Sequence, residues 1–153
     1  MTQEDRELLI IDLCSRLPYG VRFPMKVWDD KEGKIVEKIA ELDVYNKLGY
    51  AVGTIVNGPT KEYVGEIVKP YLFPLSSMSE EQKKELDEKY NVIGVHWNNI
   101  KIYYHSQGYW DTDLEVDFQD WLWLIDWLNK NHFDYRGLIP KGLAIDATNL
   151  NVY

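Results

Sequence analysis

The sequence has a single cysteine, Cys14, among its 153 residues. One thiol forms no internal disulfide, so the fold does not depend on an oxidising compartment. No apolar run approaches the roughly 20 residues that a membrane-spanning helix needs. The first residues, Met1 to Arg6, are polar and acidic, whereas a secretory signal begins with basic and then apolar residues. These absences predict a protein of the host cell cytoplasm with no membrane partner.

Positive charge is also scarce, because 17 Lys and Arg stand against 25 Asp and Glu for a formal net charge of −8. The only adjacent basic pair, Lys83-Lys84, lies among glutamates. A phosphate backbone repels such a chain, so direct binding of nucleic acid is not expected. Glycine-rich phosphate loops are absent as well, and no cofactor is predicted.

Recognisable catalytic and metal-binding motifs are missing. His96, His105 and His132 show no zinc-ligand spacing, so no metal site is predicted. The pattern favours structural or surface roles for the histidines. As an alternative, His105 with Asp111 or Asp113 forms a general base with its orienting carboxylate, which would suit a small hydrolase or phosphodiesterase.

Aromatic residues are abundant, at 14% of the chain with six Trp and eleven Tyr. Core packing accounts for rings on apolar stripes, such as Trp121. Trp28, Trp97 and Trp110 fall near turns, where exposed rings form binding platforms for a partner pocket, a nucleobase or a sugar. We therefore name Trp97 and Trp110 as candidate binding residues.

The N-terminal half predicts a helix followed by a sheet. Thr2 and Asp5 form a capping-box pattern, and apolar residues then recur at helical spacing over 3–16, a stripe that includes Cys14 as a small buried residue. Alternating apolar residues over 21–27 predict a strand, which Pro24 places at an edge or a bulge. Ranges 35–44, 50–56 and 63–68 predict further antiparallel strands, separated by turn residues.

The middle of the chain predicts shorter elements. Two prolines within 69–74 indicate an extended segment that crosses the surface of the sheet. Ser79 and Gln82 form a second capping box, which begins a surface helix that ends near Lys89 and docks mainly through Leu86. Ranges 92–96 and 100–105 predict a hairpin that turns at 98–99.

The tryptophan-rich range 118–131 predicts the longest apolar helix, and we expect it at the centre of the core. Trp121 and Leu128 lie on its predicted core stripe. Asp113 or Asp117 is suited to cap its start, and Asn131 to adopt the left-handed conformation after its end.

These elements predict an α+β fold in which an antiparallel sheet of about four to six short strands packs with an N-terminal helix, a short surface helix and a long Trp-rich C-terminal helix. Without a linker or repeat in the sequence, residues 1–153 are predicted to form a single domain.

Acidic residues gather before and within the Trp-rich helix. Carboxylates can hold a divalent cation, but their spacing is not that of a calcium-binding loop, so helix capping and a solvated face are favoured. A surface that mimics the charge of nucleic acid is a further alternative. The cluster comprises Asp111, Asp113, Glu115, Asp117 and Asp120.

Two stretches resemble a known group of sequences, namely Lys-Pro-Tyr-Leu-Phe-Pro-Leu-Ser-Ser-Met at 69–78 and Asp-Tyr-Arg-Gly-Leu-Ile-Pro-Lys-Gly-Leu-Ala at 134–144. They are similar to uncharacterised small proteins carried by phages, prophages and mobile elements of gut Bacteroidetes, as is Arg-Leu-Pro-Tyr-Gly-Val at 16–21. Range 35–66 matches none of the motifs. The resemblance implies an origin and no catalytic residues. Members of the shared motifs are taken as candidate binding residues: Lys69, Tyr71, Ser77, Tyr135 and Arg136.

The second motif also suggests local structure. Asp134 and Arg136 are expected to pair, and Gly137 and Gly142 to supply the special backbone angles of a closing turn.

The sequence thus predicts a non-enzymatic accessory protein that binds a host protein or a small ligand, which would suit a counter-defence factor. The hydrolase or phosphodiesterase is one alternative. A virion or assembly component is another, and the sequence leaves the state of homo-oligomerisation open.

Overall fold

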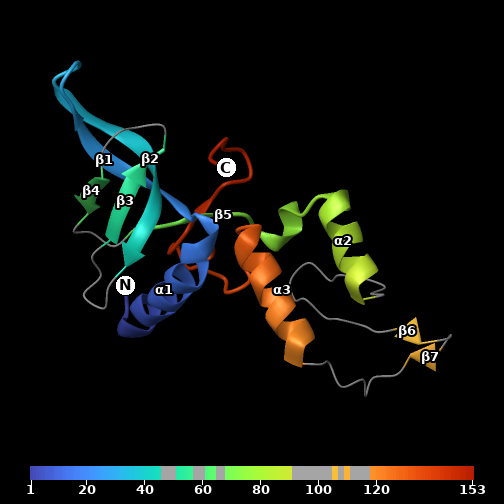
Figure 1. Ribbon diagram of the computed structural model, residues 1–153. Coiled ribbons are helices and arrows are strands. Elements are labelled where there is room, and N and C mark those ends of the chain that lie inside the picture. The colour runs from blue at the N-terminus through green and yellow to red at the C-terminus, as the bar shows by residue number, and fades with distance from the viewer. Residues whose placement is uncertain (46–50, 57–60, 65–67, 91–104, 107–108, 111–117) are drawn as a thin grey trace.

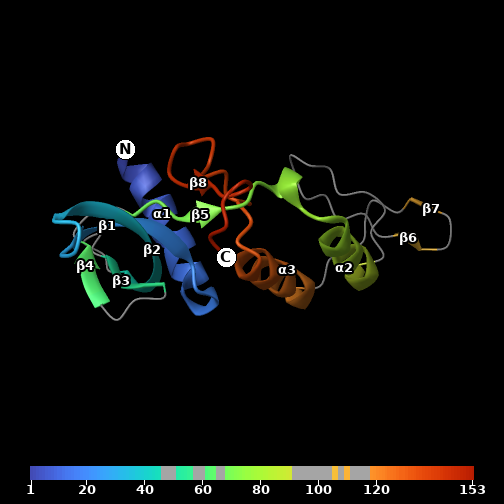
Figure 2. The same ribbon diagram turned by 90° about the horizontal axis from the view of Figure 1, so that it is seen from above.

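The computed structural model describes residues 1–45, 51–56, 61–64, 68–90, 105–106, 109–110 and 118–153. In this part of the chain, an N-terminal helix and an antiparallel sheet lie at one end, and two further helices lie toward the other (Figure 1). The C-terminal segment runs between these two groups, as the view from above also shows (Figure 2). The predicted α+β class is confirmed.

The N-terminal helix α1 (Gln3–Arg16) has the predicted bounds. The Asp5 N–H donates to Thr2 Oγ1 at 3.1 Å, and the Thr2 N–H donates to the Asp5 carboxylate at 3.0 Å. This capping box pairs two N–H groups at the helix start, where partners within the helix are lacking. A short 3-10 helix, η1 (Leu17–Tyr19), follows and ends at Gly20 with a φ of 66°.

The buried face of α1 combines leucines with an ion pair. Leu9 and Leu13 are fully buried, and so are the charged side chains of Asp12 and Arg16. The prediction that Cys14 lies buried on this helix is wrong, because its side chain is exposed. At about 100° per residue, the face that buries residues 9, 12, 13 and 16 turns residue 14 outward.

The main sheet has four antiparallel strands in the order β1-β2-β3-β4. This count is at the small end of the predicted range, because the other described strands form two separate two-stranded pairs. Pro24 lies in β1, which is an edge strand of this sheet, as predicted. The bounds are β1 (Arg22–Asp29), β2 (Lys34–Tyr45), β3 (Ala51–Ile55) and β4 (Lys61–Val64).

One face of the sheet packs on α1. Phe23, Met25 and Val27 are buried, whereas Lys26 and Trp28 between and beyond them are exposed, which confirms the predicted alternation. Gly53 of β3 faces Phe23 so closely that an added Cβ would lie 2.7 Å from Phe23 Cζ. A side chain at that position would therefore displace a central ring of the core. The buried cluster comprises Leu9, Leu13, Val21, Phe23, Met25, Val27, Ala40, Leu42, Ile55 and Val68.

The proline-containing segment is extended in its middle, as predicted, and its residues 70–72 are buried. Its strand β5 (Tyr71–Leu72) pairs in parallel with β8 (Ile145–Asp146), and both residues of β5 are buried. Phe73 then forms a parallel bridge with Phe133. Because Pro70 and Pro74 flank the short paired stretch, they do not interrupt its hydrogen bonds.

A 3-10 helix, η2 (Leu75–Ser77), leads to α2 (Glu80–Tyr90). The predicted capping box is present, since the Gln82 N–H donates to Ser79 Oγ at 3.2 Å and the Ser79 N–H donates to Gln82 Oε1 at 2.9 Å. Leu86 is buried in a cluster shared with the last long helix, as predicted for the docking residue of α2.

The Trp-rich helix α3 (Phe118–Lys130) is confirmed, but its predicted place at the centre of the core is wrong. Leu124, Trp127 and Leu128 are buried against α2 and its approach, whereas Trp121 is 42% exposed. The largest buried cluster lies between α1 and the sheet and contains no residue of α3. The reason is that the buried stripe of α3 is narrower than the sequence predicts and follows residues 124, 127 and 128.

Two short strands, β6 (His105–Ser106) and β7 (Tyr109–Trp110), pair antiparallel. The predicted hairpin over 92–105 falls mostly outside the described residues. Asp113 and Asp117, the predicted caps of α3, lie outside them as well.

Candidate functional site

The chain reverses sharply at the end of α3, and His132 makes the reversal. His132 has a φ of 56°, in the left-handed region, and among the described residues it is the only non-glycine with a positive φ. The prediction of Asn131 for this conformation is therefore wrong by one residue. The His132 carbonyl accepts from the Phe73 N–H at 2.9 Å, which holds the reversal against the segment after β5.

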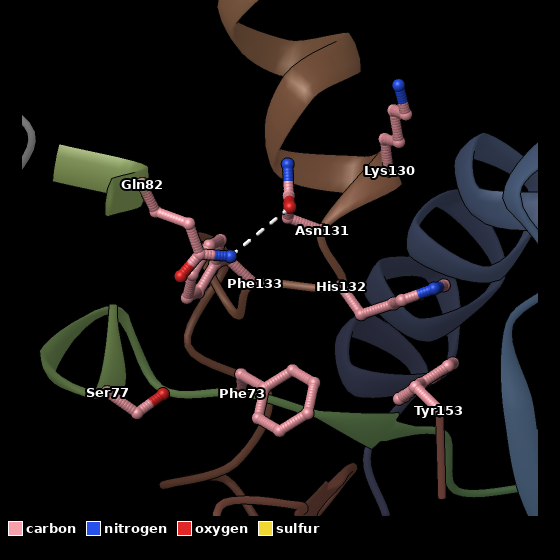
Figure 3. Close-up of a pocket in the computed structure, with 8 residues that line it drawn as sticks. All are labelled: Phe73, Ser77, Gln82, Lys130, Asn131, His132, Phe133 and Tyr153. Carbon is pink, nitrogen blue, oxygen red and sulfur yellow. Dashed lines mark hydrogen bonds between the residues drawn. The ribbon is translucent and has the colours of Figure 1, made fainter. Parts of the chain in front are cut away.

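The imidazole of His132 is buried and stacked. It lies nearly parallel to the Tyr153 ring, with ring centroids 3.8 Å apart and an angle of 14° between the planes (Figure 3). The residue is 8% exposed, and its Nδ1 is buried without a hydrogen-bond partner. Burial, with smaller effects of Arg16 and Arg22, lowers the pKa of His132 to about 4. The ring is therefore neutral at physiological pH.

Tyr153 links this histidine to the sheet. Its hydroxyl donates to Tyr71 O at 2.8 Å and accepts from the Arg22 N–H at 3.1 Å, and the Arg22 guanidinium lies 5.5 Å from the centre of its ring. Although the residue is 38% exposed overall, burial raises the pKa of the Tyr153 hydroxyl to about 12. The side chain is thus fixed as a neutral hydrogen-bonded phenol.

A cavity of about 380 Å³ opens beside the stacked pair. Figure 3 shows its wall, to which α3 and the following turn, the start of α2, η2 and the C-terminal residue all contribute. Such a volume lies within the range of small-molecule sites. We call it the His132 cavity, and its lining consists of Phe73, Ser77, Gln82, Lys130, Asn131, His132, Phe133 and Tyr153.

A second cavity, of about 400 Å³, has Tyr153 as a wall in common with the first. It lies between β2, β3 and the C-terminal segment, and its polar side chains are Arg22, Lys38, Asn151 and Tyr153. None of its lining residues is a candidate from the sequence.

A buried ion network lies on α1 and the loop after α3. Arg16 Nε donates to Asp12 Oδ2 at 2.7 Å, and one terminal nitrogen of Arg16 also donates to Phe133 O at 2.8 Å. Arg136 Nε lies 3.3 Å from Asp12 Oδ1. One carboxylate therefore serves two guanidinium groups, and the other terminal nitrogen of Arg16, Nη1, is buried without a partner.

The candidates of the second motif belong to this network. The ring of Tyr135 lies 5.4 Å from the Arg16 guanidinium and 4.9 Å from that of Arg136, and its hydroxyl donates to Asn129. The expected pairing of Asp134 with Arg136 is not found. Asp134 instead accepts from the Leu138 and Ile139 N–H groups, because the chain curls back over its carboxylate. Gly137 and Gly142 have the predicted special angles, with φ of 71° and 68°.

Three candidates come from the first motif. Ser77 lines the His132 cavity, and its hydroxyl donates to Pro74 O at 2.7 Å. Tyr71 is buried, and its carbonyl holds the Tyr153 hydroxyl. Lys69 is exposed and lines neither cavity.

The remaining candidates lie elsewhere. In the backbone pairing of β6 with β7, His105 lies opposite Trp110. Trp97, Asp111 and Asp113 lie outside the described residues, so the proposed catalytic group stays a prediction.

The sequence interpretation missed the residues that shape the cavity. His132 was assigned to the structural or surface histidines, and Phe73, Gln82, Asn131 and Tyr153 were not considered as site residues. One signal was available, since a histidine directly after a helix end tolerates the left-handed conformation better than most residues. Its contact with Tyr153 has no signature in the sequence.

Within the described ranges, no group of three or more His, Cys, Asp or Glu side chains is placed to hold a metal ion. No helix found there has the length and apolar character to cross a membrane. The chain matches no protein-family model, and neither a curated protein nor a solved structure is significantly similar to it. Fold and site together describe an α+β protein with a cavity beside a buried neutral histidine.

Proposed function

We propose that this protein is a small-ligand-binding protein and that the His132 cavity is its binding site. The observation that carries the proposal is the cavity of about 380 Å³, which polar and aromatic side chains from α2, α3, η2 and the C-terminal residue line together. Small-molecule sites commonly combine apolar walls with a few placed polar groups. Such a lining can pack against a ligand and hydrogen-bond its polar atoms.

The rigidity of the site supports the same proposal. The backbone of His132 is fixed by Phe73, its ring by the stack on Tyr153, and the Tyr153 hydroxyl by Tyr71 and Arg22. A site held in one conformation loses little entropy when it binds a ligand. At physiological pH the neutral imidazole adds no charge to the wall of the cavity.

The wider role is part of the proposal. The resemblance of the two motifs to proteins of phages and mobile elements supports an accessory protein that sequesters or senses a small molecule in the host cell. Ser77, a member of the first motif, lines the cavity and connects that resemblance to the site.

The test fills the cavity by mutation. Purified protein is screened by thermal shift against nucleotides, sugars and organic acids, and hits are titrated by calorimetry. We expect at least one ligand to bind the original protein and to be lost in Ser77→Phe. The matched control is Ser76→Phe, because Ser76 is an exposed neighbour that does not line the cavity.

Two results would contradict the proposal: a screen without a single binder, or a binder whose affinity is the same in Ser77→Phe. Circular dichroism melting of both variants separates a blocked cavity from a damaged fold.

A further inference from the structure

The amide side chains of the His132 cavity have their oxygens engaged and donors to spare. Gln82 Oε1 accepts from the Ser79 N–H, and Asn131 Oδ1 accepts from Gln82 Nε2 at 3.2 Å. Asn131 Nδ2 donates to Trp127 O at 2.9 Å. Since each amide nitrogen carries two N–H groups, Gln82 and Asn131 each retain one N–H that no described residue accepts.

Lys130 adds further donors to the lining. Lys130 is exposed, has three donors and no acceptor, and forms no ion pair or hydrogen bond with a described residue. The hydroxyls of Ser77 and Tyr153 already donate to backbone carbonyls, so toward a ligand they present only acceptor oxygens. Among the described residues, no Asp or Glu side chain belongs to the lining. The cavity therefore offers a ligand mainly donors and one full positive charge.

Charges behind the wall act in the same direction. Arg16 and Arg22 both disfavour protonation of His132, which means that their positive potential reaches the cavity wall. Arg16 shares Asp12, its only carboxylate partner among the described residues, with Arg136, so these two guanidinium groups have one carboxylate between them. In a chain of net charge −8, this is a local region that attracts anions.

The remaining wall is aromatic. The rings of Phe73 and Tyr153 have centroids 5.8 Å apart, and the Phe133 ring is stacked on Trp127 behind it at 5.7 Å. The planes of Phe73 and Tyr153 are inclined at 49°, so they do not form one flat wall, but each ring can pack against a ring of a ligand by its face or its edge.

From these observations we infer that the ligand of the His132 cavity is a planar ring that carries an anionic group, either a carboxylate or a phosphate. The ring lies against the aromatic wall, and the anion accepts hydrogen bonds from Lys130, Gln82 and Asn131. This inference rests on the proposed function, because it names the ligand class of the same site.

The experiment compares benzoate with benzamide, which has nearly the same shape and no charge. The ¹⁵N signals of the His132 imidazole are followed during titration of the full chain with each compound. We expect benzoate to bind at least about tenfold more tightly, since a hydrogen bond to a charged group contributes roughly 1.5–3 kcal/mol.

Two lysine variants test whether Lys130 causes the preference for benzoate over benzamide. In Lys130→Gln the ratio of the two dissociation constants should fall to less than about threefold, because the variant lacks the one full charge among the described lining residues. Lys69→Gln is the matched control, because Lys69 is exposed and does not line the cavity. In this variant the ratio of the two dissociation constants should not change. An unchanged ratio in Lys130→Gln would refute the assignment of the anion to this residue.

The outcomes distinguish failure of the anion inference from failure of the proposed function. Equal binding of benzoate and benzamide would overturn the anion inference and leave the cavity as a ligand site. If neither compound moves the His132 signals although the screen has found a ligand whose binding Ser77→Phe abolishes, the anion inference fails and the proposed function stands. Phenyl phosphate, as a third compound, distinguishes the sources of the anion: tighter binding than benzoate assigns the site to phosphate esters, and weaker binding assigns it to carboxylates.

Discussion

His132 combines a left-handed backbone with a buried, uncharged ring. Histidine is among the residues that adopt positive φ more often than average, so the conformation itself is tolerated. The ring is stabilised by its stack on Tyr153 and is kept neutral by burial and by nearby arginines. The buried Nδ1 has no hydrogen-bond partner among the described residues, which lowers the stability of the fold.

The lowered pKa of His132 predicts a dependence of stability on pH. Above pH 6.5 the histidine is neutral in both the folded and the unfolded state. As the pH falls from 6.5 to about 4, the unfolded state takes up a proton that the folded state excludes, so the free energy of unfolding decreases. The lowering to about 4 corresponds to a loss of about 3 kcal/mol.

The measurement is urea unfolding at pH 7.5 and at pH 4.5. His132→Asn is the comparison, because Asn tolerates the same backbone conformation and does not titrate. The original protein should lose about 2–3 kcal/mol more than the variant between these two pH values. Identical losses would show that His132 is not protected from protonation in the fold.

At the scale of elements, α3 has two unlike faces. Leu124, Trp127 and Leu128 pack with Leu86 of α2, whereas Trp121 and Leu122 are exposed. The helix thus holds α2 in place, and its last turn leads into the cavity. The stability of α3 and the geometry of the site are therefore linked through the same few contacts.

A pair of leucines in α3 tests this packing. Leu128→Ala, at a position that is 1% exposed, should lower the free energy of unfolding by about 2–5 kcal/mol because it leaves a cavity. Leu122→Ala, at a position that is 46% exposed, should change it by no more than about 0.5 kcal/mol. Denaturant unfolding of both variants gives the comparison, and equal losses would contradict the assigned buried face.

At the scale of the whole molecule, buried contacts fall into several clusters rather than one. The largest joins α1 to the sheet, another joins α2 to α3, and smaller ones surround β5 and β8. Polar contacts connect them: Arg16 of α1 reaches Phe133 O, and Tyr153 reaches both Tyr71 and Arg22. The site lies where these connections meet.

The ion network predicts a large effect from one carboxylate. Asp12→Ala leaves the fully buried Arg16 without its counter-ion and should cost about 3–5 kcal/mol of unfolding free energy. Glu32→Ala, the control, breaks an ion pair with Lys34 in which both side chains are more than half exposed, and should cost no more than about 1 kcal/mol. Chemical denaturation followed by tryptophan fluorescence measures both, and a small effect at Asp12 would refute the linking role.

Local patterns determined much of this fold from the sequence alone. The two capping boxes at Thr2 and Ser79, the alternation along β1 and the left-handed glycines Gly137 and Gly142 depend on neighbours within a few residues, and all were predictable. The helical character of 118–130 followed from periodicity for the same reason. Which side of that helix would be buried did not follow, because its apolar side chains are spread over more than one face.

The candidate site was decided by tertiary structure. His132 lies more than 100 positions from Arg22, and Tyr153 is 82 positions from Tyr71, so no local pattern encodes their contacts. The same holds for Arg136, whose carboxylate partner is Asp12 at the other end of the chain and not its neighbour Asp134. Short-range geometry fixes the elements, whereas the environment of a buried side chain depends on which distant segments pack around it, and only the folded chain specifies that.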